Sequence, residues 1–212
     1  MDGDADARPM TTLDEVERRL QSSSPWIDPD PAHLAAAVAL VLRERAGELE
    51  ALFIRRADWD GDPWSGDLAF PGGRIDPGDR GSPRRAAERE TLEELDLDLS
   101  GARRLGRVSD VLGRAQSIRV SCFVYGVAGD PPLRPNYEIR EAFWSPTGQF
   151  TDPGRQLRRE FQYRDRPFVM PAIRLLEDER APVLWGITYK LLEQFMQGIG
   201  QPIPGMPWDE AL

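Results

Sequence analysis

The chain has 212 residues, of which 40% are hydrophobic and 30% are charged, a composition typical of a globular protein with one ordinary domain plus decoration or two very small domains. Its formal net charge of −9 and the lack of a dense run of Lys and Arg argue against a nucleic-acid polymer as partner. A small phosphate substrate is not excluded, because metal ions and a few arginines can reverse the field of an acidic protein locally.

The first quarter of the chain predicts a tail, a short helix and a pair of strands. We expect residues 1–10 to form a disordered tail, and the capping-box pattern Thr12-Leu13-Asp14-Glu15 to start a helix that continues through Val16–Leu20. The apolar run Ala35–Leu42 predicts a buried strand, and Leu49–Arg55 is expected to be its hairpin partner.

A short strand and a helix follow. Leu68–Phe70 is expected to be a strand that leads into a glycine loop. Ser82 and Pro83 predict a helix start, because Ser is a good N-cap and Pro suits the first helical position. The helix should run to about residue 95. Its packing surface is expected to include Ala86, Thr91, Leu92 and Leu95.

The second half of the chain predicts mostly strands and one closing helix. The expected strands are Leu105–Val111, Ile118–Val127, Glu141–Trp144, Leu157–Tyr163 and Phe168–Met170. Gly186–Gln197 carries aromatic and aliphatic residues at helical spacing and predicts the last helix. Together these elements predict an α/β fold (an α+β sandwich) with a mixed β-sheet flanked by helices. We expect a tail and short helix over residues 1–25 and a single domain over residues 26–212.

Three carboxylates in the predicted central helix point to a cation site. Glu90, Glu93 and Glu94 stand at i, i+3 and i+4, so they fall within about 100° of arc on one helix face. Like charges this close repel one another, and a cation would relieve the repulsion. Beside the glycine loop at Gly72 and Gly73, this set of oxygen ligands suits Mg²⁺ or Mn²⁺ with a phosphate substrate.

These residues resemble the Nudix hydrolases. The family box reads G-x5-E-x7-R-E-U-x-E-E-x-G-U, where U is bulky and aliphatic. The matching positions in this chain are Gly73, Arg89, Glu90, Glu93, Glu94 and Leu97. The resemblance implies that residues 26–212 form a Nudix hydrolase domain.

The box departs from the family pattern at three places. Asp79 stands where Glu is usual, which keeps the charge on a shorter arm. Two extra residues lie within Arg80–Pro83, where a loop should tolerate an insertion. Asp96 replaces the closing Gly, and Asp accepts the left-handed conformation at a helix end better than most residues.

The segments around the box look like the coenzyme A pyrophosphatase-like branch of the family. The resemblance rests on Asp62–Gly66, Leu68–Pro71, the Asp76 and Asp79 pair, and Leu184–Thr188. It implies coenzyme A or a derivative as the substrate. The Ala57–Gly66 loop is atypical of that branch. ADP-ribose, NADH, a nucleotide sugar or a dinucleoside polyphosphate is therefore the alternative substrate, and a non-catalytic nucleotide-binding module is the third hypothesis.

The resemblance implies a metal-dependent hydrolase that acts on an acid anhydride, the pyrophosphate bond of a nucleoside diphosphate derivative. The implied metal ligands for Mg²⁺ or Mn²⁺ are Glu90, Glu93 and Glu94, with the carbonyl of Gly72 as a further one. Arg89, at i and i+4 from Glu93, is expected to hold a carboxylate in place, so we count Glu90, Arg89 and Glu93 as the catalytic residues.

The general base and the phosphate contacts are less constrained. Family members place the base differently, which leaves Glu90, Glu138 and Glu141 open as candidates. Three arginines on segments that should flank the site are expected to contact phosphate. They are Arg55, Arg56 and Arg74, although strand alternation lets only one of the first two face the site.

The tryptophans and the single histidine have two interpretations each. Trp59 and Trp64 are expected either to stack on a nucleobase or simply to pack. His33, Trp144 and Trp185 are interpreted as structural.

The sequence predicts a cytoplasmic protein. Residues 1–4 are acidic and polar, unlike a secretory signal, and the apolar runs such as Leu34–Leu42 are too short for a membrane helix. Cys122 is the single cysteine, which excludes an intrachain disulfide and fits a reducing compartment. The expected partner is a small-molecule nucleoside diphosphate substrate, with no nucleic-acid polymer and no membrane, and a homodimer is left open.

Overall fold

Two long parallel strands form the centre of the fold in the computed structural model, which describes residues 12–30, 33–59, 65–113, 118–163 and 166–205. Strand β1 (Leu34–Arg45) pairs with β7 (Ile118–Gly126) over nine residues. On its other side β1 pairs antiparallel with β2 (Glu48–Arg56) through a two-residue turn. Ala46 and Gly47 both have positive φ there, as such a tight hairpin requires.

The remaining strands extend this pair into a mixed sheet and add a small second one. The large sheet has the order β3-β2-β1-β7-β5, with β4 paired to β1, β6 to β7 and β8 to β2. The added strands are β3 (Leu68–Ala69), β4 (Gly72–Arg74), β5 (Arg103–Arg107), β6 (Val111–Gly113) and β8 (Ile139–Pro146). The second sheet, β11-β10-β9, consists of β9 (Gln156–Tyr163), β10 (Arg166–Ile173) and β11 (Leu184–Trp185).

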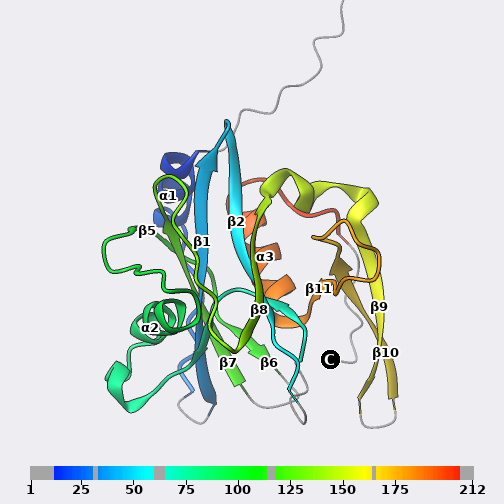
Figure 1. The fold of residues 1–212 in the computed structure, drawn as a ribbon, viewed down its shortest axis with the longest axis horizontal. Helices are drawn as coiled ribbons and strands as arrows, with labels where there is room; N and C mark the ends of the chain where they lie inside the picture. The colour runs from blue at the N-terminus through cyan, green and yellow to red at the C-terminus, as the bar shows by residue number, and fades with distance from the viewer. Residues whose placement is uncertain (1–11, 31–32, 60–64, 114–117, 164–165, 206–212) are drawn as a thin grey trace, which may run out of the picture.

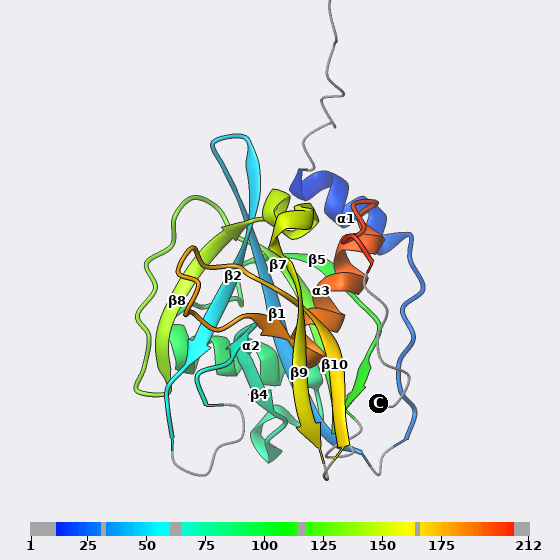
Figure 2. The ribbon, with the colours of Figure 1, turned by 90° about the vertical axis from the view of Figure 1, so that its right-hand side faces the viewer.

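Helices cover both faces of the large sheet, which confirms the expected α/β architecture (Figure 1). They are α1 (Leu13–Gln21), α2 (Pro83–Leu95) and α3 (Gly186–Gly198). Helix α2 lies on one face, and α3 lies on the other together with β9 and β10 (Figures 1 and 2). No helix within the described ranges is long and apolar enough to cross a membrane.

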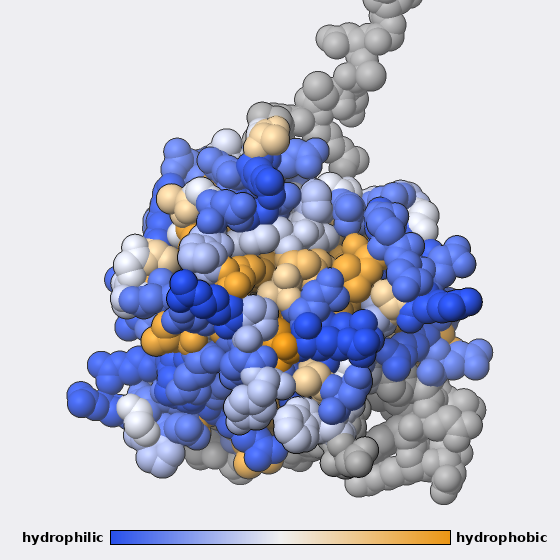
Figure 3. All heavy atoms as spheres, in the orientation of Figure 1, coloured by the Kyte–Doolittle hydropathy of each residue, from blue (hydrophilic) through white to orange (hydrophobic). Residues whose placement is uncertain are grey.

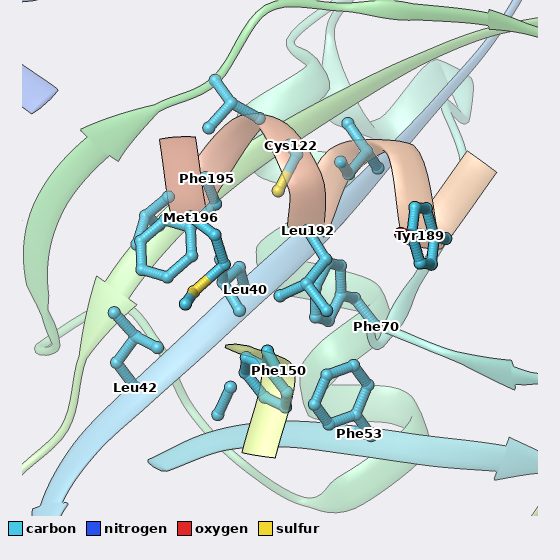
Figure 4. Close-up of a cluster of buried hydrophobic side chains, with 14 of the residues drawn as sticks. Leu40, Leu42, Phe53, Phe70, Cys122, Phe150, Tyr189, Leu192, Phe195 and Met196 are labelled. Atoms are coloured by element: carbon cyan, nitrogen blue, oxygen red, sulfur yellow. The ribbon is translucent and has the colours of Figure 1, made fainter. Parts of the chain in front are cut away.

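The sheet separates two buried clusters, because alternate residues of each strand point to opposite faces. On β2, Phe53 belongs to the cluster with α1 and α3, whereas Leu52 and Ile54 belong to the cluster with α2. Figure 4 shows the first cluster, in which Phe53 and Phe150 face the side chains of α3 across the space between them. The outer surface in Figure 3 is mostly hydrophilic, with hydrophobic residues in a band across its middle.

The capping signals in the sequence are confirmed at two helices. Thr12 Oγ1 accepts a hydrogen bond from the Glu15 N–H, 3.2 Å away, and α1 begins at the next residue. Ser82 Oγ accepts from the Arg85 N–H at 3.4 Å, and α2 begins at Pro83. Helix α2 ends at Leu95, and Asp96 takes the left-handed conformation with φ 55°. These local rules therefore set the bounds of the helix that carries the glutamates.

The expectation of one strand over Leu105–Val111 is wrong. The segment divides into β5 and β6, because the Asp110 N–H donates to the Trp26 carbonyl at 2.9 Å instead of to β7. The Asp110 carboxylate is buried and accepts from Ser121 Oγ at 2.9 Å. A buried polar side chain thus interrupts a run that looks strand-like in sequence.

Two further expectations near the glycines are also wrong. Leu92 does not pack, since 44% of it is exposed, and Ala87 and Glu94 are buried on α2 instead. The glycine loop contains a strand, β4, whose Gly72 pairs with Val38. Glycine has low strand propensity, so the sequence of β4 gives no indication of a strand. The strand forms because β1 lies close enough to pair with it. Trp64 lies outside the described residues.

The burial on α2 predicts unequal costs for two leucines of one helix. Leu95 is fully buried, so Leu95→Ala should lower the free energy of unfolding by about 2–5 kcal/mol. Leu92→Ala removes the same atoms from an exposed position and should cost less than about 1 kcal/mol. Urea unfolding of both variants measures the difference, and equal losses would contradict the assigned face of α2.

Candidate functional site

A cavity of about 550 Å³ lies between α2, β4, the end of β2 and the segment before β8. Among the described residues, five carboxyl groups and three guanidinium groups line it, so the acidic side chains outnumber the basic ones by two. They belong to Asp76, Glu90, Glu93, Glu94 and Glu138, and to Arg56, Arg74 and Arg89. The three glutamates of α2 therefore share one cavity with two of the three arginines that the sequence proposes as phosphate contacts.

The two glycines of β4 let α2 approach the sheet. Gly72 has φ 147°, and a Cβ there would meet the Ala37 carbonyl and lie 2.5 Å from Val38 Cα. A Cβ on Gly73 would lie 2.5 Å from Glu90 Cδ. Any side chain at position 72 would push β4 off β1, and one at position 73 would displace the glutamate.

Glu94 is the buried carboxylate of the site. Only 2% of the residue is exposed, and its Oε2 accepts a hydrogen bond from the Gly72 N–H at 2.9 Å. Burial raises the pKa of Glu94 to about 8, and the nearby charges of Glu90 and Glu138 act in the same direction. The Gly72 hydrogen bond and Arg56 oppose this shift. Without a further cation the ionised form of Glu94 is costly.

Glu90 lies between Glu94 and the arginine that precedes it. Burial also raises the pKa of Glu90, while the charge of Arg89 lowers it. Its Oε1 is 3.0 Å from Arg89 Nη1. The pKa of Glu90 is thus raised from its ordinary value, chiefly by burial.

Arg89 braces the acidic groups around it. Its Nε and Nη2 donate to the two oxygens of Asp79, at 3.1 and 3.0 Å. Its Nη1 donates to Glu93 Oε2 at 3.0 Å, and Nη2 also donates to the Arg74 carbonyl at 3.1 Å. A single guanidinium therefore connects α2 to β4 and to the turn that carries Asp79.

Asp79 is the site residue to which sequence reasoning gave no role, although its place six positions after Gly73 marked it. It is 3% exposed, and its hydrogen bonds with Arg89 hold its pKa below the ordinary value. The inserted residues that follow form a turn in which Arg80 and Gly81 both have positive φ. The insertion is thereby accommodated before the Ser82 cap, and the glutamate face stays in place.

The paired arginines of β2 face different cavities. Arg56 lines the carboxylate cavity. Arg55 lines a second cavity, on the face of β2 turned away from α2. Arg74 lies at the carboxylate cavity and is exposed.

The candidates for the general base also separate. Glu138 lines the carboxylate cavity, and the segment before it is tied to the end of α2, where the Asn136 N–H donates to the Glu94 carbonyl at 2.9 Å. Glu141 lies opposite Arg55 in the pairing of β8 with β2, which directs it to the other face.

An exposed aromatic pair stands at the edge of the cavity. The rings of Trp59 and Tyr137 meet edge to face, 6.1 Å between centroids, and are 54% and 74% exposed. Tyr137 also lines the cavity. Exposed rings beside a cavity offer an apolar surface for a nucleobase.

The remaining aromatic candidates make internal contacts. His33 Nδ1 lies 2.7 Å from Asp28 Oδ2. The Arg43 guanidinium lies 4.2 Å from the centre of the Trp144 ring. Trp185 Nε1 donates to Asp67 at 3.0 Å. All three have partners within the protein.

The donor set fits a hard divalent cation in chemistry, although the carboxylates are not converged. Among the described residues no three acidic, His or Cys side chains form a ready metal-binding group. Glu93 lies against Arg89, and Glu94 lies against the Gly72 N–H. Carboxyl and carbonyl oxygens are the donors that Mg²⁺ or Mn²⁺ prefers, and a bound cation would favour the ionised form of these carboxyl groups.

Two curated proteins are similar to this chain in sequence. A probable nudix hydrolase of Schizosaccharomyces pombe is 28% identical over 136 residues, covering 64% of this chain and 46% of the relative. An uncharacterized protein of the same yeast is 34% identical over 115 residues, covering 50% of this chain and 35% of the relative. The chain thus spans less than half the length of the curated relatives it matches.

Solved structures give weaker likenesses. A Nudix hydrolase from M. smegmatis is 23% identical with a TM-score of 0.47, over 61% of this chain and 80% of that one. A C. elegans Ap4A hydrolase is 22% identical with a TM-score of 0.44, over 51% and 77%. Neither TM-score reaches 0.5, so neither likeness decides the activity. The NUDIX domain family model, however, matches residues 32–168, which is more than half of the chain and includes α2 and its glutamates, and the chain therefore belongs to the NUDIX family.

Proposed function

We propose that the protein is a metal-dependent pyrophosphohydrolase that cleaves the pyrophosphate bond of a nucleoside diphosphate derivative. The observation that carries the proposal is the buried Glu94, held on the Gly72 N–H in a cavity where, among the described residues, the acidic side chains outnumber the arginines by five to three. Such an arrangement is costly unless a cation compensates it. Non-catalytic nucleotide binding is disfavoured, because the chain keeps Glu90, Glu93 and Glu94.

Mg²⁺ or Mn²⁺ would be held by Glu90, Glu93, Glu94 and the carbonyl of Gly72. When bound, the ion neutralises phosphate charge, orients the phosphates and acidifies a water. Arg89 is a positioning residue in this proposal. It holds Glu93 and Glu90 by direct contacts and takes its own orientation from Asp79.

The protein's own groups supply the proton acceptor and the anion contacts. Glu90 is the favoured base, because its raised pKa suits proton transfer closer to neutral pH. Glu138, which lines the same cavity, is the second candidate. Arg56 and Arg74 contact the phosphates, and the exposed face of Trp59 takes the nucleobase.

The favoured substrate is coenzyme A or a derivative, because the segments around the box resemble that branch of the family. ADP-ribose, NADH, a nucleotide sugar and a dinucleoside polyphosphate are the alternatives. The cytoplasmic setting, the homodimer and the division at residue 25 remain predictions. A panel of these substrates with Mg²⁺ and with Mn²⁺, read by product mass, identifies the preferred one. No turnover of any substrate by folded protein would end the proposal.

Glu94→Gln tests the metal-ligand assignment. It keeps the size of the side chain and an acceptor for the Gly72 N–H but removes the charge, so the rate should fall about a hundredfold or more. Glu141→Gln is the matched control. It makes the same chemical change on β8, at a residue that faces away from the carboxylate cavity, and should keep the wild-type rate. Turnover assays on the best panel substrate compare the two, and a wild-type rate in Glu94→Gln would show the assignment to be wrong.

The raised pKa of Glu94 predicts how pH affects the stability of the metal-free protein. A carboxyl whose folded pKa is about 8, against 4.5 in the ordinary state, stabilises the fold below pH 4.5 and loses this contribution as pH rises through 8. In EDTA, wild type should therefore lose a few kcal/mol more than Glu94→Gln between pH 5 and pH 9. Urea unfolding at both pH values measures this, and Mg²⁺ at pH 9 should restore wild type alone. Parallel pH profiles would contradict the burial argument.

Asp79→Asn tests whether the Asp79–Arg89 contact positions the glutamates of the site. The variant leaves Arg89 without its buried counter-charge and should cost about 3 kcal/mol of unfolding free energy at pH 7. Because the pKa of Asp79 is lowered, this cost should fade as the pH drops below about 4. We expect kcat to fall ten- to a hundredfold with a smaller change in KM. Asp79→Glu, which carries the usual box residue, should recover part of kcat; an unchanged kcat in Asp79→Asn would exclude a positioning role.

A further inference from the structure

A second cavity, of about 350 Å³, lies on the face of β2 turned away from the glutamates of α2. It is bounded by the end of β2, the segment before β3, strand β9 and the segment that leads into β11. Three arginines from separate parts of the chain line it: Arg55, Arg159 and Arg180. The function proposed above uses none of this cavity.

Strand geometry brings Arg55 into this cavity. Phe53, two positions earlier, packs in the cluster with α3, so Arg55 faces the same side of the sheet. The Arg55 Nε is buried and has no hydrogen-bond partner among the residues that the structure describes. A buried donor without a partner is costly unless a ligand or water accepts from it. Glu141, its register partner on β8, is exposed.

The carboxylates of the cavity are already engaged. Asp58 accepts from Arg140 Nη1 at 2.9 Å. Asp67 accepts from Trp185 Nε1 at 3.0 Å and lies 3.7 Å from an Arg159 nitrogen.

The arginines therefore hold the unbalanced charge. Over the described residues, Arg180 pairs through its backbone N–H alone, with Asp178, and its guanidinium has no counter-charge. Arg55 has none either, whereas the Arg159 guanidinium lies 4.7 Å from the centre of the Trp185 ring. In a chain with a net charge of −9, this is a concave surface of the opposite sign.

We propose that this cavity binds a phosphate group. Guanidinium groups present planar forks of donors that match phosphate oxygens, and several converging arginines suit a doubly charged anion better than a carboxylate. The volume also leaves room for the group to which the phosphate is esterified. The site is separate from the carboxylate cavity, because the consecutive residues Arg55 and Arg56 line the two cavities from opposite faces of β2.

Two sources can supply such a phosphate. One is a phosphate monoester that the substrate carries besides its pyrophosphate, in which case the inference rests on the proposed function. The other is a separate phosphate or phosphate-bearing small molecule that does not take part in the reaction.

The binding experiment is calorimetric titration of the full chain with inorganic phosphate in EDTA, where the carboxylate cavity repels anions. Arg55→Gln and Arg180→Gln should each weaken binding about tenfold. Arg158→Gln is the matched control, because it removes the same charge from the neighbouring, exposed position on β9 and should bind like wild type. Wild-type affinity in both cavity variants, equal loss in Arg158→Gln, or equally tight binding of acetate overturns the proposal. This readout does not depend on turnover.

The kinetic arm distinguishes the sources with coenzyme A and 3′-dephospho-coenzyme A, which differ by one phosphate monoester. If the substrate supplies the phosphate, Arg180→Gln should raise KM about tenfold for the first compound alone. If the phosphate is separate, KM for both compounds stays at the wild-type value while phosphate binding is weakened. Failure of the enzyme to hydrolyse either compound bears on the proposed function and leaves the binding result intact.

Discussion

The contact between the Gly72 N–H and the buried Glu94 carboxylate is the constraint on which the rest of the site depends. It ties α2 to β4, and β4 is itself tied to β1 by a pairing that allows no Cβ at position 72. Burial removes Glu94 from water and raises its pKa to about 8, and the Gly72 N–H opposes this shift only in part. Glu94 is therefore mostly protonated at neutral pH, and a cation in the cavity would favour its ionised form.

Arg89 stabilises the other acidic groups around α2 by direct contacts. Its guanidinium contacts Asp79, Glu90 and Glu93, whereas Glu94 accepts a hydrogen bond from the Gly72 N–H. A positive charge that entered the cavity would therefore act first on Glu94 and would compete with Arg89 for the other two glutamates. Glu90 and Glu93 contact Arg89 while Glu94 contacts the Gly72 N–H, and these separate partners explain why the three carboxyl groups do not converge.

The sequence predicts those parts of the site that local geometry determines. Residues at i, i+3 and i+4 share a helix face whatever the rest of the fold does, and the Ser82 cap and the left-handed Asp96 bound that helix. Contacts between distant segments escaped prediction. Leu92 was expected to pack because it is apolar, yet the neighbouring strands bury Glu94 instead. Strand β4 has no apolar pattern, and Asp110 interrupts a strand through a bond to Trp26, 84 positions earlier in the chain.

The dipeptide Arg55-Arg56 shows how one local rule acquires meaning only from the whole fold. The alternation of side chains along a strand predicts that Arg55 and Arg56 point to opposite faces of the sheet, but it does not predict what each of them contacts. Which of them meets the glutamates depends on α2 packing against Leu52 and Ile54, and what the other meets depends on β9 and the segment before β11. Because one strand end lines both cavities, a shift of β2 would alter both at once. One strand thus contributes consecutive residues to two cavities that lie on opposite faces of the sheet.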